Sequence, residues 1–260
     1  MCTPALRELK RINPRCHVRF YTNFGSLVRG LSYIDEVFPF DRFPPGAIFL
    51  KYEDAIPPQA HLARVMGDSL GVNVRDVRPD CVIESRLVEQ FRESWQALPR
   101  PHVVVQRRAS AWTPNKDWPD LYWDDLIDRL LRRSAVIEVG AQVENNSVRN
   151  LDQYIDLRGQ TSIEQLVAVV AAADIIVAPM SSAVHIAAAA QIPSVIVYGG
   201  YEHPSNTAYT GNIPLYTPVP CSPCWLREPC PYDRKCLSAI LPKTVEEAIL
   251  TKWEESRRPS

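Results

Sequence analysis

The stretch that constrains the fold most runs from Ala173 to Gly200 (ADIIVAPMSSAVHIAAAAQIPSVIVYGG). Ile175–Ala178 is a short apolar run rich in β-branched residues, which is typical of a strand buried on both faces. The small-residue segment Ala183–Ala190 predicts a helix, and Pro193 separates it from a second apolar run at Ser194–Tyr198. A strand, a helix and a strand in this order predict two parallel strands joined by a crossover helix.

The turn between this first strand and the helix places polar groups where an anion can bind. Ser181 and Ser182 are good N-cap residues, and the first backbone N–H groups of a helix have no partner within it. Hydroxyls and N–H groups beyond the carboxyl end of a strand suit a phosphate or pyrophosphate. The alternative is an ordinary core unit that binds nothing. On this turn alone we favour that alternative, because Ser-Ser turns are common and have no fingerprint of their own.

Length, charge and hydropathy limit the class of protein. The 260 residues, 46% of them apolar, are enough for two modest domains or one large one. A formal net charge of −1 indicates neither a nucleic-acid partner nor a strong membrane attraction. No apolar run approaches the roughly 18–20 residues of a membrane span, and the charged N-terminal segment lacks the apolar core of a signal peptide. We therefore expect a cytoplasmic protein.

Apolar runs alternate with helical patterns over most of the chain. From residue 102 onward, the alternation predicts a doubly wound α/β domain with a parallel sheet, which ends in a Cys-rich loop (218–237) and a helix. In the first hundred residues, apolar runs also alternate with helical patterns, but the runs are shorter and the first predicted element is a helix instead of a strand. Thr3 is expected to be the N-cap of that helix, with Pro4 in its first turn. A Pro-Arg-Pro run at 99–101 indicates a linker, so we predict domains at 1–98 and 99–260.

Several polar residues follow predicted strands, which is where sheets of this kind bind ligands. Lys116, in a strand-to-helix loop, could neutralise phosphate charge, whereas for Arg107 and Arg108 we favour solvent-exposed charge. Glu144 follows the next strand, where a carboxylate can accept hydrogen bonds from ribose hydroxyls, although an ordinary exposed glutamate is the simpler explanation. His185 lies one turn into the short helix and is expected to bind a ligand or support the site, not to act as a base.

Four of the seven cysteines lie close together in the sequence: Cys221, Cys224, Cys230 and Cys236. In a cytoplasmic protein such clustering favours a metal over disulfides. Four thiolates could hold zinc or iron in a closed structural site that fastens a Pro-rich loop. The first pair has the spacing of a metal knuckle but the later spacings are unusual, so reduced thiols in a loop are the alternative.

The order of several segments resembles glycosyltransferase family 9, the bacterial heptosyltransferase-like enzymes. The most specific segment, Leu157–Gly199, is similar to the D-S-G-x-x-H region of the family. Other segments that resemble the family are TPALRELKRINP (3–14), YIDEVFPF (33–40), NKDWP (115–119), VGAQVE (139–144) and CSPCWLREPC (221–230). The resemblance covers nearly the whole chain. It implies an α/β fold of the GT-B type, with two Rossmann-like domains, a cleft between them and a reduced N-terminal domain.

The resemblance also implies a reaction, in which a heptose-like sugar passes with inversion from a nucleotide-diphosphate donor to an acceptor hydroxyl. The donor would be similar to ADP-heptose and lie on the C-terminal domain, with the N-terminal domain on the acceptor side. The acceptor would be a glycan, such as the lipopolysaccharide core, or a protein, with peripheral membrane contact and no nucleic acid. Matched by position, the donor-binding set is Lys116 (phosphate), Glu144 (ribose), Gln160 and Thr161 (nucleoside), Ser181, Ser182 and Ala183 (pyrophosphate), and His185.

Two departures from the family pattern affect catalysis. The motif aspartate of the family falls on Met180, which cannot pair with a basic group, and the motif glycine falls on Ser182. The family's proposed base is an aspartate in a Gly-Asp loop before the first helix, and this sequence starts after that point, so the catalytic residue is unassigned. Loss of a general base typically costs about 10²–10⁴ in rate, so weak transfer could survive. We expect a glycosyltransferase; the alternatives are a catalytically impaired nucleotide-sugar-binding or scaffold protein, and a metal-stapled interaction module.

Overall fold

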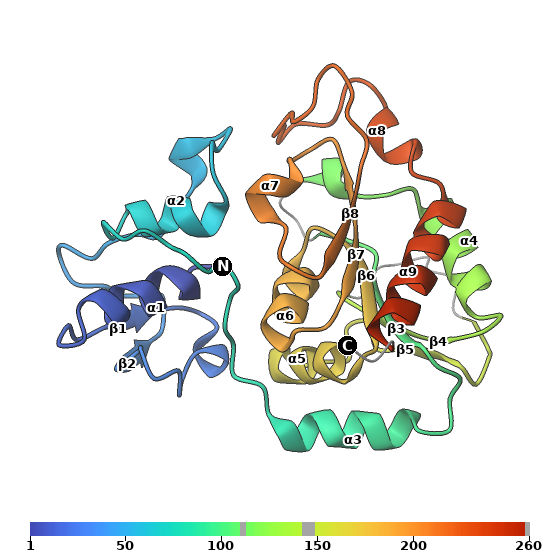
Figure 1. The fold of residues 1–260 in the computed structure, drawn as a ribbon, viewed down its shortest axis with the longest axis horizontal. Helices are drawn as coiled ribbons and strands as arrows, with labels where there is room; N and C mark the ends of the chain where they lie inside the picture. Colours follow the sequence, from blue (N-terminus) through green and yellow to red (C-terminus); the bar gives the residue numbers. More distant parts are fainter. Residues whose placement is uncertain (110–112, 142–148, 258–260) are drawn as a thin grey trace.

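The computed structural model describes residues 1–109, 113–141 and 149–257 (Figure 1). Within these ranges the larger part of the molecule is built on a six-stranded parallel sheet in the order β5-β4-β3-β6-β7-β8. Its strands are β3 His102–Gln106, β4 Ala135–Val139, β5 Tyr154–Asp156, β6 Ile175–Pro179, β7 Ser194–Gly199 and β8 Asn212–Tyr216. The chain moves outward from β3 in one direction and from β6 in the other. The strand order therefore reverses between β3 and β6, and sheets of this kind bind ligands beside such a reversal.

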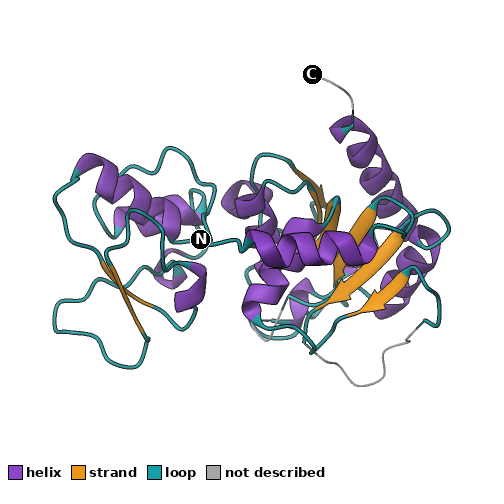
Figure 2. Cartoon of the chain, turned by 90° about the horizontal axis from the view of Figure 1, so that it is seen from below, coloured by secondary structure: helices purple, strands orange, loops and turns teal. Residues whose placement is uncertain are grey.

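Helices cover both faces of the sheet, as the view along it in Figure 2 shows. Because successive side chains of a strand point to opposite faces, Val103 and Val105 of β3 belong to one core cluster and Val104 to the other. The first cluster includes α4 (Asp120–Leu130) and α9 (Pro242–Ser256), and the second includes α3 (Ser85–Trp95), α5 (Ile163–Ala172) and α6 (Ser182–Ala190). The residues of β3, β4, β6 and β7 are all buried, which explains their continuous apolar sequences.

The N-terminal part is smaller. Its strands β1 (Arg19–Tyr21) and β2 (Glu36–Phe38) pair in parallel, and α1 (Thr3–Ile12) and α2 (Leu62–Asp68) pack against each other. Two short 3-10 turns complete the regular structure described there, η1 (Gly25–Leu27) and η2 (Glu53–Ala55). A groove of about 760 Å³ runs beside β1. Its lining includes five exposed or half-exposed apolar side chains, Phe24, Phe40, Phe43, Ile48 and Phe49.

One local prediction for this part was wrong. Thr3 is the first residue of α1 instead of its N-cap, which is Cys2 and makes no side-chain cap. The Thr3 hydroxyl accepts a hydrogen bond from the backbone N–H of Asp80, 2.9 Å away. Because a threonine oxygen bound to a distant segment is not available to the next turn of its own helix, the tertiary contact replaces the local cap.

The two parts touch along the segment that leads into α2. The Asn206 side chain donates hydrogen bonds to the carbonyl oxygens of Pro58 and Ala60, each at 3.1 Å. After this segment the chain returns to the larger part, where α3 packs on α5 (Figure 1). The predicted boundary at residue 98 assigned α3 to the first domain; that boundary stays a prediction, although the packing of α3 favours an earlier one.

Elements with strong local signals agree with the sequence patterns. The apolar run at His102–Gln106 is a strand, and Ser162 caps α5 through a capping box with Gln165. The pattern did not predict β8 or the short α7 (Pro204–Thr207), α8 (Lys235–Ser238) and η3 (Pro114–Lys116). β8 contains Pro214, which is tolerated because β8 is an edge strand. In the part of the chain that the structure describes, no helix is both long and apolar enough to cross a membrane.

Candidate functional site

A pocket of about 230 Å³ lies between the two parts of the molecule, at the carboxyl ends of the central strands. The larger part supplies most of its lining, from the segments that follow β3, β6, β7 and β8. These residues are Ala109, Lys116, Met180, Ser181, Ser182, His185, Glu202, Thr207 and Trp225. Met1, Tyr52 and Leu62 of the N-terminal part close the pocket. The structure thus brings four residues of the predicted donor-binding set, Lys116, Ser181, Ser182 and His185, to one cavity.

The N-terminus of α6 forms one wall of this pocket. Ser181 is at the N-cap position, as predicted, but its hydroxyl does not cap the helix. Instead it donates to the side-chain oxygen of Gln106 at the end of β3, 3.1 Å away, and the backbone N–H of Ala183 donates to the same oxygen at 3.3 Å. Two of the groups predicted to receive pyrophosphate are therefore occupied by Gln106. Ser182 is exposed and lines the pocket.

Lys116 faces the same pocket from η3. Its Nζ lies 2.6 Å from Oε1 of Glu202 and 4.9 Å from the centre of the Tyr201 ring. The Glu202 side chain is only 2% exposed and that of Lys116 15% exposed, so the ion pair is shielded from solvent. An ammonium group has three N–H donors, and one contact with Glu202 leaves donor capacity for a ligand.

His185 is neutral in this environment. Its Nδ1 lies 2.7 Å from the hydroxyl of Tyr209, and burial, with smaller contributions from nearby positive groups such as Lys116, holds its pKa well below the usual value. Burial also raises the pKa of Tyr209 well above its usual value, so the phenol stays protonated. His185 and Tyr209 can therefore donate or accept hydrogen bonds with a ligand, but they bring no positive charge to the pocket.

Three other residues of the predicted set lie elsewhere or cannot be placed. Gln160 and Thr161 follow β5 and are not part of the pocket lining; Gln160 is exposed and donates its side-chain amide to the carbonyl oxygen of Asp156. Glu144 lies outside the described residues. Met180, where the family has an aspartate, is buried, and its sulfur accepts a 3.5 Å contact from the Tyr198 hydroxyl.

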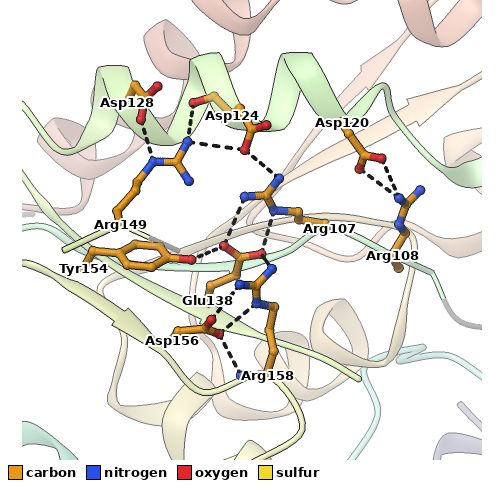
Figure 3. Close-up of polar contacts among 10 residues, drawn as sticks. All are labelled: Arg107, Arg108, Asp120, Asp124, Asp128, Glu138, Arg149, Tyr154, Asp156 and Arg158. Atoms are coloured by element: carbon orange, nitrogen blue, oxygen red, sulfur yellow. Dashed lines mark hydrogen bonds and ion pairs between the residues drawn. The ribbon is translucent and has the colours of Figure 1, made fainter. Parts of the chain in front are cut away.

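A buried charge network at the carboxyl ends of β3, β4 and β5 was not predicted (Figure 3). Glu138, fully buried in β4, accepts from Arg107 at 2.6 Å and from Tyr154 at 2.7 Å, and it lies 3.1 Å from Arg158. Arg107 also donates to Asp124 of α4 at 2.9 Å. The interpretation of Arg107 as solvent-exposed charge was wrong, because its side chain is only 5% exposed. A glutamate inside an apolar strand was the available signal, since buried charges need a partner.

The four clustered cysteines lie near one another but do not have the arrangement of a metal site among the described residues. None of the seven cysteines forms a disulfide. Burial raises the pKa of Cys224, and Cys221, Cys236 and Cys230 are near enough to raise it further. The backbone N–H of Leu226, hydrogen-bonded to the Cys224 sulfur, opposes that increase. Among the described residues, no group of three or more His, Cys, Asp or Glu side chains has the arrangement of a metal site.

Comparison with known proteins decides the family. The model of glycosyltransferase family 9 (heptosyltransferase) matches residues 52–234, which is more than half of the chain. The chain belongs to glycosyltransferase family 9. A curated member, lipopolysaccharide heptosyltransferase 1 of Pseudomonas aeruginosa, is 26% identical over 147 residues, which cover 53% of this chain and 40% of that protein. The chain spans about half the length of the curated relatives that it matches.

Solved structures of the family share the fold. E. coli ADP-heptose lps heptosyltransferase II superposes with a TM-score of 0.73 at 15% identity, over 99% of this chain and 95% of that one. The iron-containing dodecameric heptosyltransferase TibC of enterotoxigenic E. coli, in complex with ADP-D-beta-D-heptose, gives 0.70 at 17% identity, over 97% of this chain and 72% of TibC. The predicted GT-B arrangement of two α/β domains with parallel sheets is confirmed.

Proposed function

We propose that this family 9 chain binds a nucleotide-diphosphate sugar in the pocket between its two parts and transfers the sugar, with inversion, to an acceptor hydroxyl. The observation that carries the proposal is the convergence of Lys116, from η3, with Ser182 and His185, both from α6, on one cavity at the strand-order reversal. Ligands of doubly wound sheets bind at that position. The alternative of an ordinary core turn does not account for a lysine aimed at the same cavity.

The diphosphate would lie between Lys116 and the start of α6. A helix N-terminus has the equivalent of about half a positive charge, and Lys116 contributes a full one. Glu202 holds Lys116 over the pocket and at the same time opposes the phosphate charge, so the pocket attracts a diphosphate less strongly than a bare lysine would. When the sugar leaves, negative charge grows on the diphosphate, and the same lysine and amide donors stabilise it.

The attacking hydroxyl would need a base. Among the described pocket residues, Glu202 is already paired with Lys116, and burial lowers the pKa of His185, which makes its imidazole a weak base. The proposal therefore assigns no catalytic base among these pocket residues. It predicts slow transfer, because general-base catalysis contributes typically about 10²–10⁴ in rate and the remaining interactions still act on the leaving group.

The family suggests the substrates. We infer a donor similar to ADP-heptose, because TibC is described in complex with ADP-D-beta-D-heptose, and an acceptor that is a glycan of the lipopolysaccharide type or a protein. The groove beside β1 is the proposed acceptor side. Its aromatic lining, with Phe40, Phe43 and Phe49 packed within 6.4 Å of one another, suits the apolar part of an acceptor or a shallow membrane contact. A cytoplasmic location is part of the same proposal and is supported by the unpaired state of all seven cysteines.

Turnover of radiolabelled ADP-heptose tests this function. We expect slow release of ADP by the wild type, with or without an acceptor glycan, and at least a tenfold slower release by K116M/E202Q, which keeps the pocket free of an unpaired charge. ADP binding without any turnover, also in a chain extended at its N-terminus by a strand and a Gly-Asp loop, would leave the alternative of a nucleotide-sugar-binding or scaffold protein.

A structural metal is a second proposal, independent of the transfer reaction. The chemistry of four thiols in one loop suits zinc or iron, and backbone N–H groups point at two of the sulfurs, Cys224 and Cys236. The described arrangement is not that of a formed metal site, so binding would draw the four thiols together. Cys221, Cys224, Cys230 and Cys236 would hold the ion. Metal analysis of anaerobically purified protein should find about one ion per chain, lost in C221S/C224S; its absence from the wild type would remove this proposal and the interaction-module alternative with it.

A further inference from the structure

The Cys-rich loop is fastened to the segment that follows β7. The backbone N–H of Cys224 donates to the carbonyl oxygen of Gly200 at 3.2 Å, and that of Trp225 donates to Tyr201 at 3.0 Å. Gly200 has no room for a side chain, because an added Cβ would lie 2.2 Å from the Ser222 hydroxyl oxygen and 3.2 Å from the Cβ of Cys236. The loop is therefore held closely against the segment 199–201.

Trp225 is held in an unusual conformation at this junction. Its φ of +50° lies in the left-handed region, which bulky residues rarely adopt and which surrounding contacts must enforce. The residue is only 8% exposed, and its indole N–H has no hydrogen-bond partner among the residues that the structure describes. Packing, not the polar atom of the side chain, fixes its position.

The indole of Trp225 contacts both parts of the molecule. Its ring lies 5.4 Å from the ring of Tyr201, over which the Nζ of Lys116 sits at 4.9 Å. Trp225 and Tyr201 also form one buried cluster with Leu62, the first residue of α2, and Tyr52 packs against that cluster. Trp225, Leu62, Tyr52 and Lys116 all line the 230 Å³ pocket. A shift of the loop would thus reach Lys116 through Tyr201 and α2 through this cluster.

We propose that Trp225 is a positioning residue that makes the cysteine loop a wall of the interdomain pocket, so that the chemical state of the four cluster thiols sets both the contact with α2 and the affinity for a nucleoside diphosphate. The ligand in this statement rests on the proposed function; the contact with α2 does not. If the cysteine loop had only a local structural role, it would not need an indole between the two parts of the molecule, or packing that continues from Cys224 to Lys116.

Alkylation of the cluster thiols with N-ethylmaleimide tests the coupling. A C2S/C16S/C81A background leaves only the four cluster cysteines reactive. We expect alkylation to weaken ADP binding at least tenfold by calorimetry and to speed hydrogen exchange in α2 (Leu62–Asp68) at least tenfold. W225A should show both effects before alkylation and little further change after it, because the two perturbations act on one contact. W225F, which keeps an aromatic ring, should stay close to the wild type.

Two results would overturn the proposal. One is α2 exchange that does not respond to alkylation in the C2S/C16S/C81A protein; this readout decides the matter even where W225A fails to fold or ADP fails to bind. The other is independent, additive effects of alkylation and W225A on ADP affinity. Wild-type protein that does not bind ADP contradicts the proposed function instead, and α2 exchange still decides the link between the cysteines and the N-terminal part.

Discussion

The ion pair of Lys116 and Glu202 allows a structural role to be separated from a binding role. At 2.6 Å and an effective dielectric constant near 20, the two charges attract by about 6 kcal/mol, most of which offsets their loss of hydration. K116M leaves Glu202, 2% exposed, as an unpaired carboxylate. We expect this to lower the free energy of unfolding by about 3 kcal/mol, the lower end for a buried pair, because Lys116 is partly exposed.

The double variant K116M/E202Q removes both charges and should recover the stability to within about 1 kcal/mol of the wild type. Its affinity for ADP should not recover. Lys116 would make a charge-assisted hydrogen bond with the diphosphate, worth about 1.5–3 kcal/mol, so both K116M and the double variant should bind ADP roughly 10- to 150-fold more weakly. E202Q alone should bind ADP as tightly as the wild type or more tightly, because the opposing charge is gone.

Urea unfolding gives the stabilities and titration calorimetry gives the ADP affinities. The reasoning fails if K116M/E202Q regains wild-type affinity for ADP together with its stability, because Lys116 would then serve only to neutralise Glu202. It also fails if E202Q weakens ADP binding as much as K116M does. The Glu202 carboxylate would then help Lys116 to bind the nucleotide instead of repelling the phosphate.

Three further perturbations test other parts of the account. Burial lowers the pKa of His61 to about 4. Between pH 6.5 and 4 the folded state therefore binds fewer protons than the unfolded state, and the free energy of unfolding decreases as the pH falls. H61N, which keeps an N-cap acceptor, should reduce this pH-dependent loss of unfolding free energy by roughly 2–3 kcal/mol. E138Q should cost about 3 kcal/mol in urea unfolding, because Arg107 would lose its buried partner, and an effect below 0.5 kcal/mol would refute that role of the network. S162A should cost about 1 kcal/mol through loss of the α5 capping box, and an unchanged melting temperature would refute it.

The sequence predicted the elements whose signals are local. Strands buried on both faces require continuous apolar runs, so β3 and β6 could be recognised from a few residues each. Ser162 and Gln165 satisfy each other within one turn, which makes the start of α5 equally readable. The short helices and β8 lacked such patterns, because a four-residue helix has no full hydrophobic period.

The candidate site depended on contacts between distant residues. Lys116 was predicted to neutralise phosphate charge, but its partner Glu202 was not foreseen, because Glu202 follows another strand and becomes a neighbour only in the folded sheet. The hydroxyl of Ser181 was predicted to cap a helix or bind phosphate, but it donates its hydrogen bond to the side-chain oxygen of Gln106, at the end of the adjacent strand. Side-chain chemistry indicated which residues gather at the pocket, whereas their pairing follows from strand order, which a local pattern does not contain.

A crystal structure of the protein with ADP tests the central claim most directly. We predict the diphosphate in the interdomain pocket, with a phosphate oxygen within about 3 Å of the Nζ of Lys116 and close to Ser182 at the start of α6. A nucleotide bound elsewhere, for example in the aromatic groove beside β1, with Lys116 still paired only to Glu202, would contradict the account.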